Sequence, residues 1–91
     1  MDSFIGSRIA PEALEQAVSA IYGRHLLLAE VPVEDDLFTL GADSLMAAGI
    51  VLELERTFGV KVPQEVFIET QSVRRVAAWL VAQGVTAERG R

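Results

Sequence analysis

The sequence contains no cysteine, which excludes disulfide bonds, thiolate-bound metals and thiol nucleophiles. Its one histidine, His25, has no candidate partner nearby in the sequence, and we interpret it as a helix-end or surface residue. No apolar run reaches the roughly 18–20 residues that a membrane span needs, and residues 1–10 lack the pattern of a secretory signal. We therefore expect a cytoplasmic protein with no metal site and no membrane association.

Basic side chains are also few. The chain has 8 Lys and Arg against 13 Asp and Glu, a formal net charge of −5. Nucleic-acid binding requires the opposite sign, so we expect no nucleic-acid partner. Residues 25–72 hold nine acidic and two basic side chains, which gives that stretch a net charge of −7. The negative electrostatic potential of this stretch suits a partner with a basic surface. The alternative is that the acidic side chains only keep the surface solvated.

Periodic apolar residues predict two long helices. The length of 91 residues allows one domain, and an apolar content of 51% is high enough for it to fold. Pro11 predicts the start of a first helix that runs to about Leu27. A second helix is predicted over Ser44–Phe58, with Asp43 or Ser44 as its N-cap and Gly59 as its stop. Apolar residues recur at helical spacing in both: Leu14, Ala17, Val18 and Ile21, then Ala47, Ile50, Val51, Leu54 and Phe58.

The C-terminal part of the chain predicts two further helices. A short one lies around Gln64–Ile68, and the last follows the cap residue Ser72 and ends by Gly84. The apolar stripe of the last helix is Val73, Val76, Ala77, Leu80 and Val81. Residues 28–43 have no helical period and predict a long loop, which five apolar residues pin to the core: Val31, Val33, Leu37, Phe38 and Leu40.

The predicted fold class is all-α. We expect a small four-helix bundle, made of three main helices and a short third helix, with the long loop between the first two helices. Residues 1–10 are predicted to form a flexible N-terminal arm. Residues 11–83 form the domain, and residues 84–91 form a flexible tail.

One segment could carry chemistry: Gly41-Ala42-Asp43-Ser44-Leu45. A hydrolase nucleophile elbow has the pattern G-x-S-x-G between a strand and a helix. Ala42 and Met46 occupy the two glycine positions and no strand precedes them, so that interpretation fails. A simple alternative remains, in which Ser44 only caps the second helix.

The segment Leu40–Leu45 resembles the attachment motif of acyl carrier proteins, the thiolation domains of fatty-acid, polyketide and nonribosomal-peptide systems. The resemblance covers roughly residues 11–82. It extends to Leu37-Phe38 before the motif and to several groups after it: Leu54-Glu55, Phe58-Gly59-Val60, Pro63 and Thr70 through Leu80.

This resemblance implies that Ser44 bears a covalent 4′-phosphopantetheine arm, which a phosphopantetheinyl transferase installs from coenzyme A. Asp43 matches the acidic residue that helps to engage the metal ion of the transferase. The physical chemistry agrees, because a phosphodiester at a helix N-terminus meets free N–H groups and the positive end of the helix dipole. In a chain without cysteine, the thiol of the arm would be the only thiol.

The second helix is the usual partner-recognition element of this family. By that match, the exposed partner-binding positions are Leu45, Met46, Ala48, Gly49, Leu52, Glu53, Glu55 and Arg56. They include a second apolar stripe, for which Leu45, Ala48 and Leu52 supply the apolar side chains. We interpret this stripe as a docking surface rimmed by Glu53 and Glu55. The alternative is that the 28–43 loop covers it.

The expected function is that of a carrier, not an enzyme. A discrete monomer acting in trans would hold acyl or aminoacyl groups as thioesters and deliver them to partner enzymes: an acyltransferase, a ketosynthase, or an acyl or aminoacyl ligase. The acid before Ser44, where peptide-synthetase carriers often have histidine, favours polyketide or fatty-acyl cargo. Met46, Gly49 and Arg56 favour a specialised pathway such as antibiotic biosynthesis. Two alternatives stay open: an amino-acid carrier in a nonribosomal-peptide-like pathway, and a non-catalytic helical interaction module.

Overall fold

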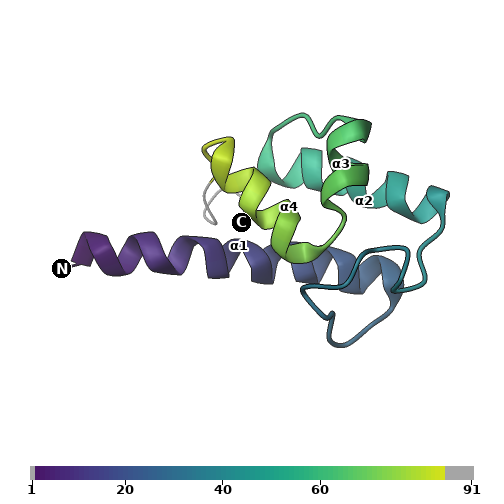
Figure 1. Cartoon of the computed structure of the whole chain (residues 1–91), viewed down its shortest axis with the longest axis horizontal. Helices are drawn as coiled ribbons and strands as arrows, with labels where there is room; N and C mark the ends of the chain where they lie inside the picture. The colour runs from purple at the N-terminus through teal and green to yellow at the C-terminus, as the bar shows by residue number, and fades with distance from the viewer. Residues whose placement is uncertain (1, 86–91) are drawn as a thin grey trace.

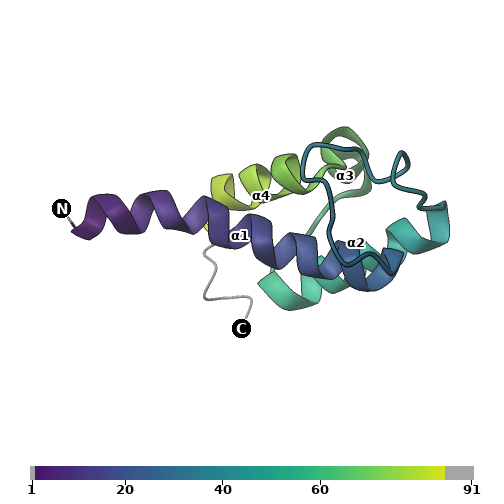
Figure 2. The ribbon, with the colours of Figure 1, turned by 90° about the horizontal axis from the view of Figure 1, so that it is seen from below.

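The protein folds into four helices. The computed structural model describes the backbone of residues 2–85 and the side chains of residues 12–85. The helices are α1 (Asp2–Leu26), α2 (Ser44–Phe58), α3 (Gln64–Thr70) and α4 (Val73–Ala82), and no strand occurs within residues 2–85. Helix α1 packs against both α4 and α2, and its first turns extend past the other helices (Figures 1 and 2). The predicted all-α bundle with a long loop and a short third helix is confirmed.

The start of α1 differs from the prediction. The helix begins at Asp2 rather than at Pro11, so residues 2–10 are helical. An interior proline removes one hydrogen bond and its ring crowds the carbonyl four residues earlier, which disfavours a helix, yet the backbone of α1 is helical on both sides of Pro11. The predicted flexibility of residues 1–10 stays a prediction. Of the predicted C-terminal tail, residues 86–91 lie outside the described residues, whereas Val85 is buried and donates its N–H to the Leu80 carbonyl at 3.0 Å.

The core is formed by the predicted apolar stripes. Leu14, Val18 and Ile21 of α1 are buried, and the buried residues of the other helices are Ala47, Ile50, Leu54, Phe58, Phe67, Val73, Val76, Ala77 and Leu80. Val81 is exposed, and Ala17 and Val51 are half-buried, so these three predicted core positions lie at its edge. Complete burial of apolar side chains from three long helices is the main force that holds this small domain together.

Tyr22 is a core residue that the apolar pattern missed. Its ring is completely buried, and its hydroxyl donates a hydrogen bond to the Gln71 carbonyl between α3 and α4. Burial raises the pKa of Tyr22, and the negative charge of Asp36 raises it further. The phenol therefore stays protonated and remains a donor, which ties α1 to the corner between α3 and α4.

The long loop is tied to the N-terminal end of α4. Leu37 is completely buried, whereas Phe38 is exposed, so the predicted anchor at Phe38 is wrong; its neighbour occupies the interior position. The Arg74 N–H donates to the Val33 carbonyl at 2.9 Å. The Arg74 side chain pairs with Glu34 of the loop. These contacts fasten the loop at its middle.

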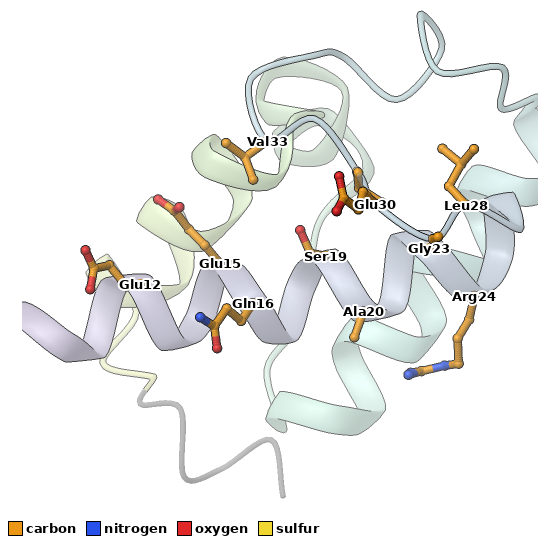
Figure 3. Close-up of a pocket in the computed structure, with 12 residues that line it drawn as sticks. Glu12, Glu15, Gln16, Ser19, Ala20, Gly23, Arg24, Leu28, Glu30 and Val33 are labelled. Atoms are coloured by element: carbon orange, nitrogen blue, oxygen red, sulfur yellow. The ribbon is translucent and has the colours of Figure 1, made fainter.

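At the other end of the loop, the chain turns back over α1. Leu27, directly after α1, has a positive φ of 59°, and the Leu28 N–H donates to the Gly23 carbonyl at 3.0 Å. A Cβ at Gly23 would lie only 2.8 Å from the Leu28 oxygen. Figure 3 shows the loop, with Glu30 and Val33, lying over the face of α1 at this point. Glycine is therefore required where the loop crosses the helix.

We expect Gly23→Ala to lower the free energy of unfolding by about 1–3 kcal/mol, because the new methyl group overpacks against backbone. This loss exceeds the helix-propensity gain of about 1 kcal/mol that alanine brings. Urea denaturation measures the difference. Gly49→Ala is the matched control, because its methyl would meet only the movable His25 ring, at 3.3 Å, and should cost less. If the Gly23→Ala protein were as stable as the parent, glycine would not be required where the loop crosses α1.

Candidate functional site

The candidate site lies where the long loop enters α2. Backbone N–H groups of Leu40 and Ala42 donate to the Leu37 carbonyl at 3.1 and 3.3 Å, which closes a compact turn. Gly41 within this turn has a φ of 104°, a conformation that other residues rarely adopt. Because Leu37 and Ala42 are buried, the turn is anchored on the core and leaves the next two residues, Asp43 and Ser44, exposed.

Asp43 is the N-cap of α2, so the alternative in which Ser44 only caps this helix does not hold. Its Oδ1 accepts a hydrogen bond from the Met46 N–H at 2.8 Å, and its carbonyl accepts from the Ala47 N–H at 2.9 Å. Ser44 is the first residue of the helix, and its hydroxyl makes no hydrogen bond with any described residue. The result is an exposed, unengaged hydroxyl at the positive end of the helix dipole.

A groove of about 470 Å³ opens beside Ser44, between α2 and α3. It is lined by Ser44 and Gln64 and otherwise by apolar side chains: Phe38, Ala47, Ala48, Val51, Leu52, Val62, Phe67 and Ile68. These surroundings fit a phosphopantetheine group. The Ser44 hydroxyl can take the phosphodiester, the first-turn N–H groups favour the negative charge, and the groove can accommodate the rest of the arm or its cargo.

The second apolar stripe of α2 is not covered by the loop. Leu45 is 83% exposed and Leu52 is 56% exposed. Ala48 and Arg56 are exposed as well. The alternative in which the loop covers this stripe is therefore wrong, and α2 presents large apolar side chains to solvent.

The other four predicted partner-binding residues are half-buried rather than exposed: Met46, Gly49, Glu53 and Glu55. Met46 packs against the core, and the open side of Gly49 faces the His25 ring. The Glu55 carboxylate accepts a hydrogen bond from the Val62 N–H at 2.8 Å, which links the end of α2 to the segment before α3. The expected acidic rim is thus largely engaged in contacts within the fold.

Glu53 joins α2 to the C-terminal end of α1. Its carboxylate pairs with Arg24 and, at 2.8 Å, with Nε2 of His25. Burial raises the pKa of Glu53, but the hydrogen bonds and charges of Arg24 and His25 lower it by more, so it lies below its ordinary value. The ionised pair therefore stabilises the fold above the pKa that Glu53 has in the unfolded chain, and this stabilisation is lost as the pH falls through the lower folded-state pKa.

Sequence reasoning placed His25 correctly at a helix end but missed this pairing. The two partners are 28 residues apart, and no local pattern connects them. Within the described residues, no three His, Cys, Asp or Glu side chains are grouped so that they could hold a metal ion. None of the helices in this part of the chain has both the length and the apolar character needed to cross a membrane.

We expect Asp43→Ala to lower the free energy of unfolding by about 1 kcal/mol through loss of the helix cap. Asp43→Asn keeps an oxygen acceptor and should lose less. Ser44→Ala removes no hydrogen bond to the described residues and should stay within about 0.5 kcal/mol of the parent. Thermal denaturation of the three variants measures the order. If Ser44→Ala lowered the free energy of unfolding by more than Asp43→Ala, Ser44 rather than Asp43 would be the capping residue.

Comparison with known proteins places this geometry in a family. The family model described as phosphopantetheine attachment site matches residues 12–80. Indigoidine synthase of Dickeya dadantii is 36% identical over 73 residues, which are 79% of this chain but 5% of that protein. The chain therefore spans a small part of this much longer relative.

Two solved structures have the same fold. BlmI, a type-II acyl carrier protein of Streptomyces verticillus involved in bleomycin biosynthesis, is 27% identical with a TM-score of 0.80; the match covers 86% of this chain and 94% of BlmI. A peptidyl carrier protein in complex with the phosphopantetheine transferase Sfp and coenzyme A has a TM-score of 0.72 at 20% identity, over 76% of this chain and 90% of that one. The chain belongs to the phosphopantetheine-attachment family of carrier domains, whose cofactor is 4′-phosphopantetheine and whose members are carriers rather than catalysts.

Proposed function

We propose that Ser44 is the residue to which 4′-phosphopantetheine is joined, and that the chain delivers acyl or aminoacyl groups to partner enzymes. The observation that carries this proposal is the exposed Ser44 hydroxyl, unengaged among the described residues, at the first position of α2 and within the matched range 12–80. When bound, the group supplies the thiol on which such cargo is held as a thioester, in a chain without cysteine.

The residues around Ser44 have separable roles in this proposal. Asp43 fixes the start of α2, so the hydroxyl stays in one position as the nucleophile that attacks the coenzyme A pyrophosphate bound by a transferase, with the adenosine bisphosphate part of coenzyme A as the leaving group. By resemblance, the exposed carboxylate of Asp43 also helps to engage the metal ion of the transferase. Leu37 and Ala42 hold the preceding turn on the core, and Gly41 allows its sharp direction change. The chain thus presents a preformed acceptor and provides no catalytic group of its own.

The proposed partners act on this exposed end of the bundle. The first is a phosphopantetheinyl transferase; the solved complex of Sfp contains a carrier of the same fold. The later partners are an acyltransferase, a ketosynthase, or an acyl or aminoacyl ligase. We propose that they act in trans, as expected for a type-II carrier such as BlmI. The match to part of a long synthase shows that similar domains also occur within larger proteins.

Two classes of cargo are compatible with these observations. The acid before Ser44 favours polyketide or fatty-acyl cargo, whereas the peptidyl carrier with the same fold favours an aminoacyl group and a nonribosomal-peptide-like pathway. Both classes form the same thioester on the same arm, and the groove beside Ser44 is apolar without a charged side chain that would select one of them. The identity of the loading enzyme therefore decides the cargo.

The attachment site is tested by incubating the protein with coenzyme A and a transferase of broad specificity, followed by intact mass measurement. We expect addition of one phosphopantetheinyl group, because one exposed serine stands at a capped helix start. Ser44→Ala should gain no mass. Ser72→Ala is a matched control, because Ser72 caps α4 but is buried, and this variant should still be modified. If several transferases all failed to add the group, the result would favour the alternative of a helical interaction module in which Ser44 is not modified.

The cargo class is tested on the modified protein. One sample receives aminoacyl ligases with amino acids and ATP, and a second receives acyltransferases with acyl-coenzyme A substrates. We expect one class to add a single group that hydroxylamine releases, as a thioester should be released. The unmodified protein and Ser44→Ala are the controls and should gain nothing. Loading of Ser44→Ala would contradict the carrier proposal.

A further inference from the structure

Arg74, in the first turn of α4, is bonded to both the long loop and α1. Its backbone N–H donates to the Val33 carbonyl at 2.9 Å, and its guanidinium pairs with the Glu34 carboxylate of the loop. Its Nε also lies 3.4 Å from Oε2 of Glu15 on α1. Figure 3 shows the Glu15 side chain leaving α1 on the side on which Val33 and the loop lie. One residue thus connects three segments of the bundle.

The guanidinium of Arg74 pairs with two carboxylates at once. Among the described residues, no other basic side chain pairs with Glu15 or Glu34. The Glu15 side chain is half-buried, so its charge is screened less than that of an exposed residue. If the cation were removed, the two negative charges would repel each other between α1 and the loop. Arg74 therefore attracts the loop to α1, and its loss would leave a repulsion in place of that attraction.

These contacts hold the middle of the loop. Within the described residues, every hydrogen bond or ion pair from residues 29–36 to a helix goes to Arg74. The next fixed points are Leu28, at the crossing over α1, and the buried Leu37, which begins the turn that leads to Ser44. Without the contacts of Arg74, the loop between these two points would sample more conformations.

A more mobile loop would loosen the turn before Ser44. In that turn, the Leu37 carbonyl accepts hydrogen bonds from the N–H groups of Leu40 and Ala42. An enzyme that binds Ser44 has to hold this turn in a single conformation, and each residue that is ordered on binding weakens the affinity. A loop that is already ordered therefore lowers the KM for the chain as a substrate and does not change the chemistry at the hydroxyl.

We propose that Arg74 is a positioning residue for the modification of Ser44. By pairing with Glu15 and Glu34 it keeps the loop on the bundle, and the loop keeps the turn before Ser44 in the conformation that a phosphopantetheinyl transferase binds. Arg74 acts through these contacts and touches neither coenzyme A nor the Ser44 hydroxyl. This inference rests on the proposed function, in which Ser44 is the residue modified.

Hydrogen exchange of the unmodified, full-length chain tests the effect of Arg74 on the turn. In Arg74→Ala we expect the N–H groups of Leu40 and Ala42 to exchange about fivefold faster, because the turn opens more often when the loop is released. The N–H of Leu54, a buried residue of α2, should exchange as in the parent. Arg74→Lys keeps the cation and should stay within about twofold of the parent.

A second substitution separates charge from packing. Arg74→Ala combined with Glu34→Gln removes the cation and one of the two carboxylates, so no repulsion remains. This double variant should recover most of the parent exchange rate at the turn, which it would not do if Arg74 acted only through the packing of its stem. Arg75→Ala is the matched control and should behave like the parent, because Arg75 is exposed and forms no ion pair with a described residue.

The same four variants are then compared as substrates of a transferase with saturating coenzyme A, well below their thermal midpoints. We expect kcat/KM for Arg74→Ala to fall about fivefold through a higher KM, with kcat unchanged. Arg74→Lys and the double variant should recover to within about twofold of the parent. Arg75→Ala should react like the parent.

The outcomes are distinguishable. Unchanged exchange at the turn in Arg74→Ala would overturn the proposal, as would faster exchange at Leu54 too, which would assign Arg74 to the fold as a whole. A lower kcat/KM without faster exchange would indicate a direct contact with the transferase and would also overturn it. Faster exchange with an unchanged kcat/KM, or no recovery in the double variant, would overturn it as well. If the parent accepted no group, the attachment at Ser44 would be refuted, whereas the exchange rates would show whether Arg74 holds the loop.

Discussion

Leu37 is completely buried although it lies in the connection between α1 and α2, and its burial holds the turn that leads to Ser44. The carbonyl of the same residue accepts two backbone hydrogen bonds from the turn. A loop of this length would otherwise be mobile, because each free residue loses conformational entropy when it is fixed. One apolar anchor thus converts the flexible end of a loop into a defined position at the start of a helix.

Some of the acidic side chains form ion pairs within the fold, and the others among the described residues lie on the surface without such a partner. Two arginines outside the acidic stretch, Arg24 and Arg74, pair with Glu53 and Glu34 inside it. These ion pairs connect α1 with α2 and α4 with the long loop, so part of the charge asymmetry along the sequence is neutralised by folding. Exposed ion pairs of this kind contribute little individually to the free energy of folding.

The parts of the fold that were predicted correctly depend on local signals. Both ends of α2 were predicted because a capping residue and a left-handed glycine act within one turn. The same signals predicted that Ser44 begins α2, whereas its role as the attachment residue stays a proposal. The start of α1 was missed because proline is typical of a first turn and is unfavourable in a helix interior, whereas α1 continues to the N-terminal side of Pro11.

Contacts between distant segments could not be predicted in this way. The pairing of Glu53 with His25, the buried Tyr22 hydroxyl bond and the burial of Val85 each depend on how the helices are placed in three dimensions. The hydropathy pattern does not contain that information. The resemblance to the family assigned Glu53 and Glu55 to an open acidic rim, whereas packing places both within contacts of the bundle.

The unengaged Ser44 hydroxyl has a thermodynamic consequence. Under the proposed attachment, a bond formed at this oxygen replaces no hydrogen bond to the described residues, so the modification removes no contact of this kind from the fold. If Ser44 is the attachment residue, the turn and the cap at Asp43 hold the start of α2 in the same way with or without the attached group. A carrier that must be loaded and unloaded repeatedly requires this independence, because each cycle would otherwise perturb the structure that its partners recognise.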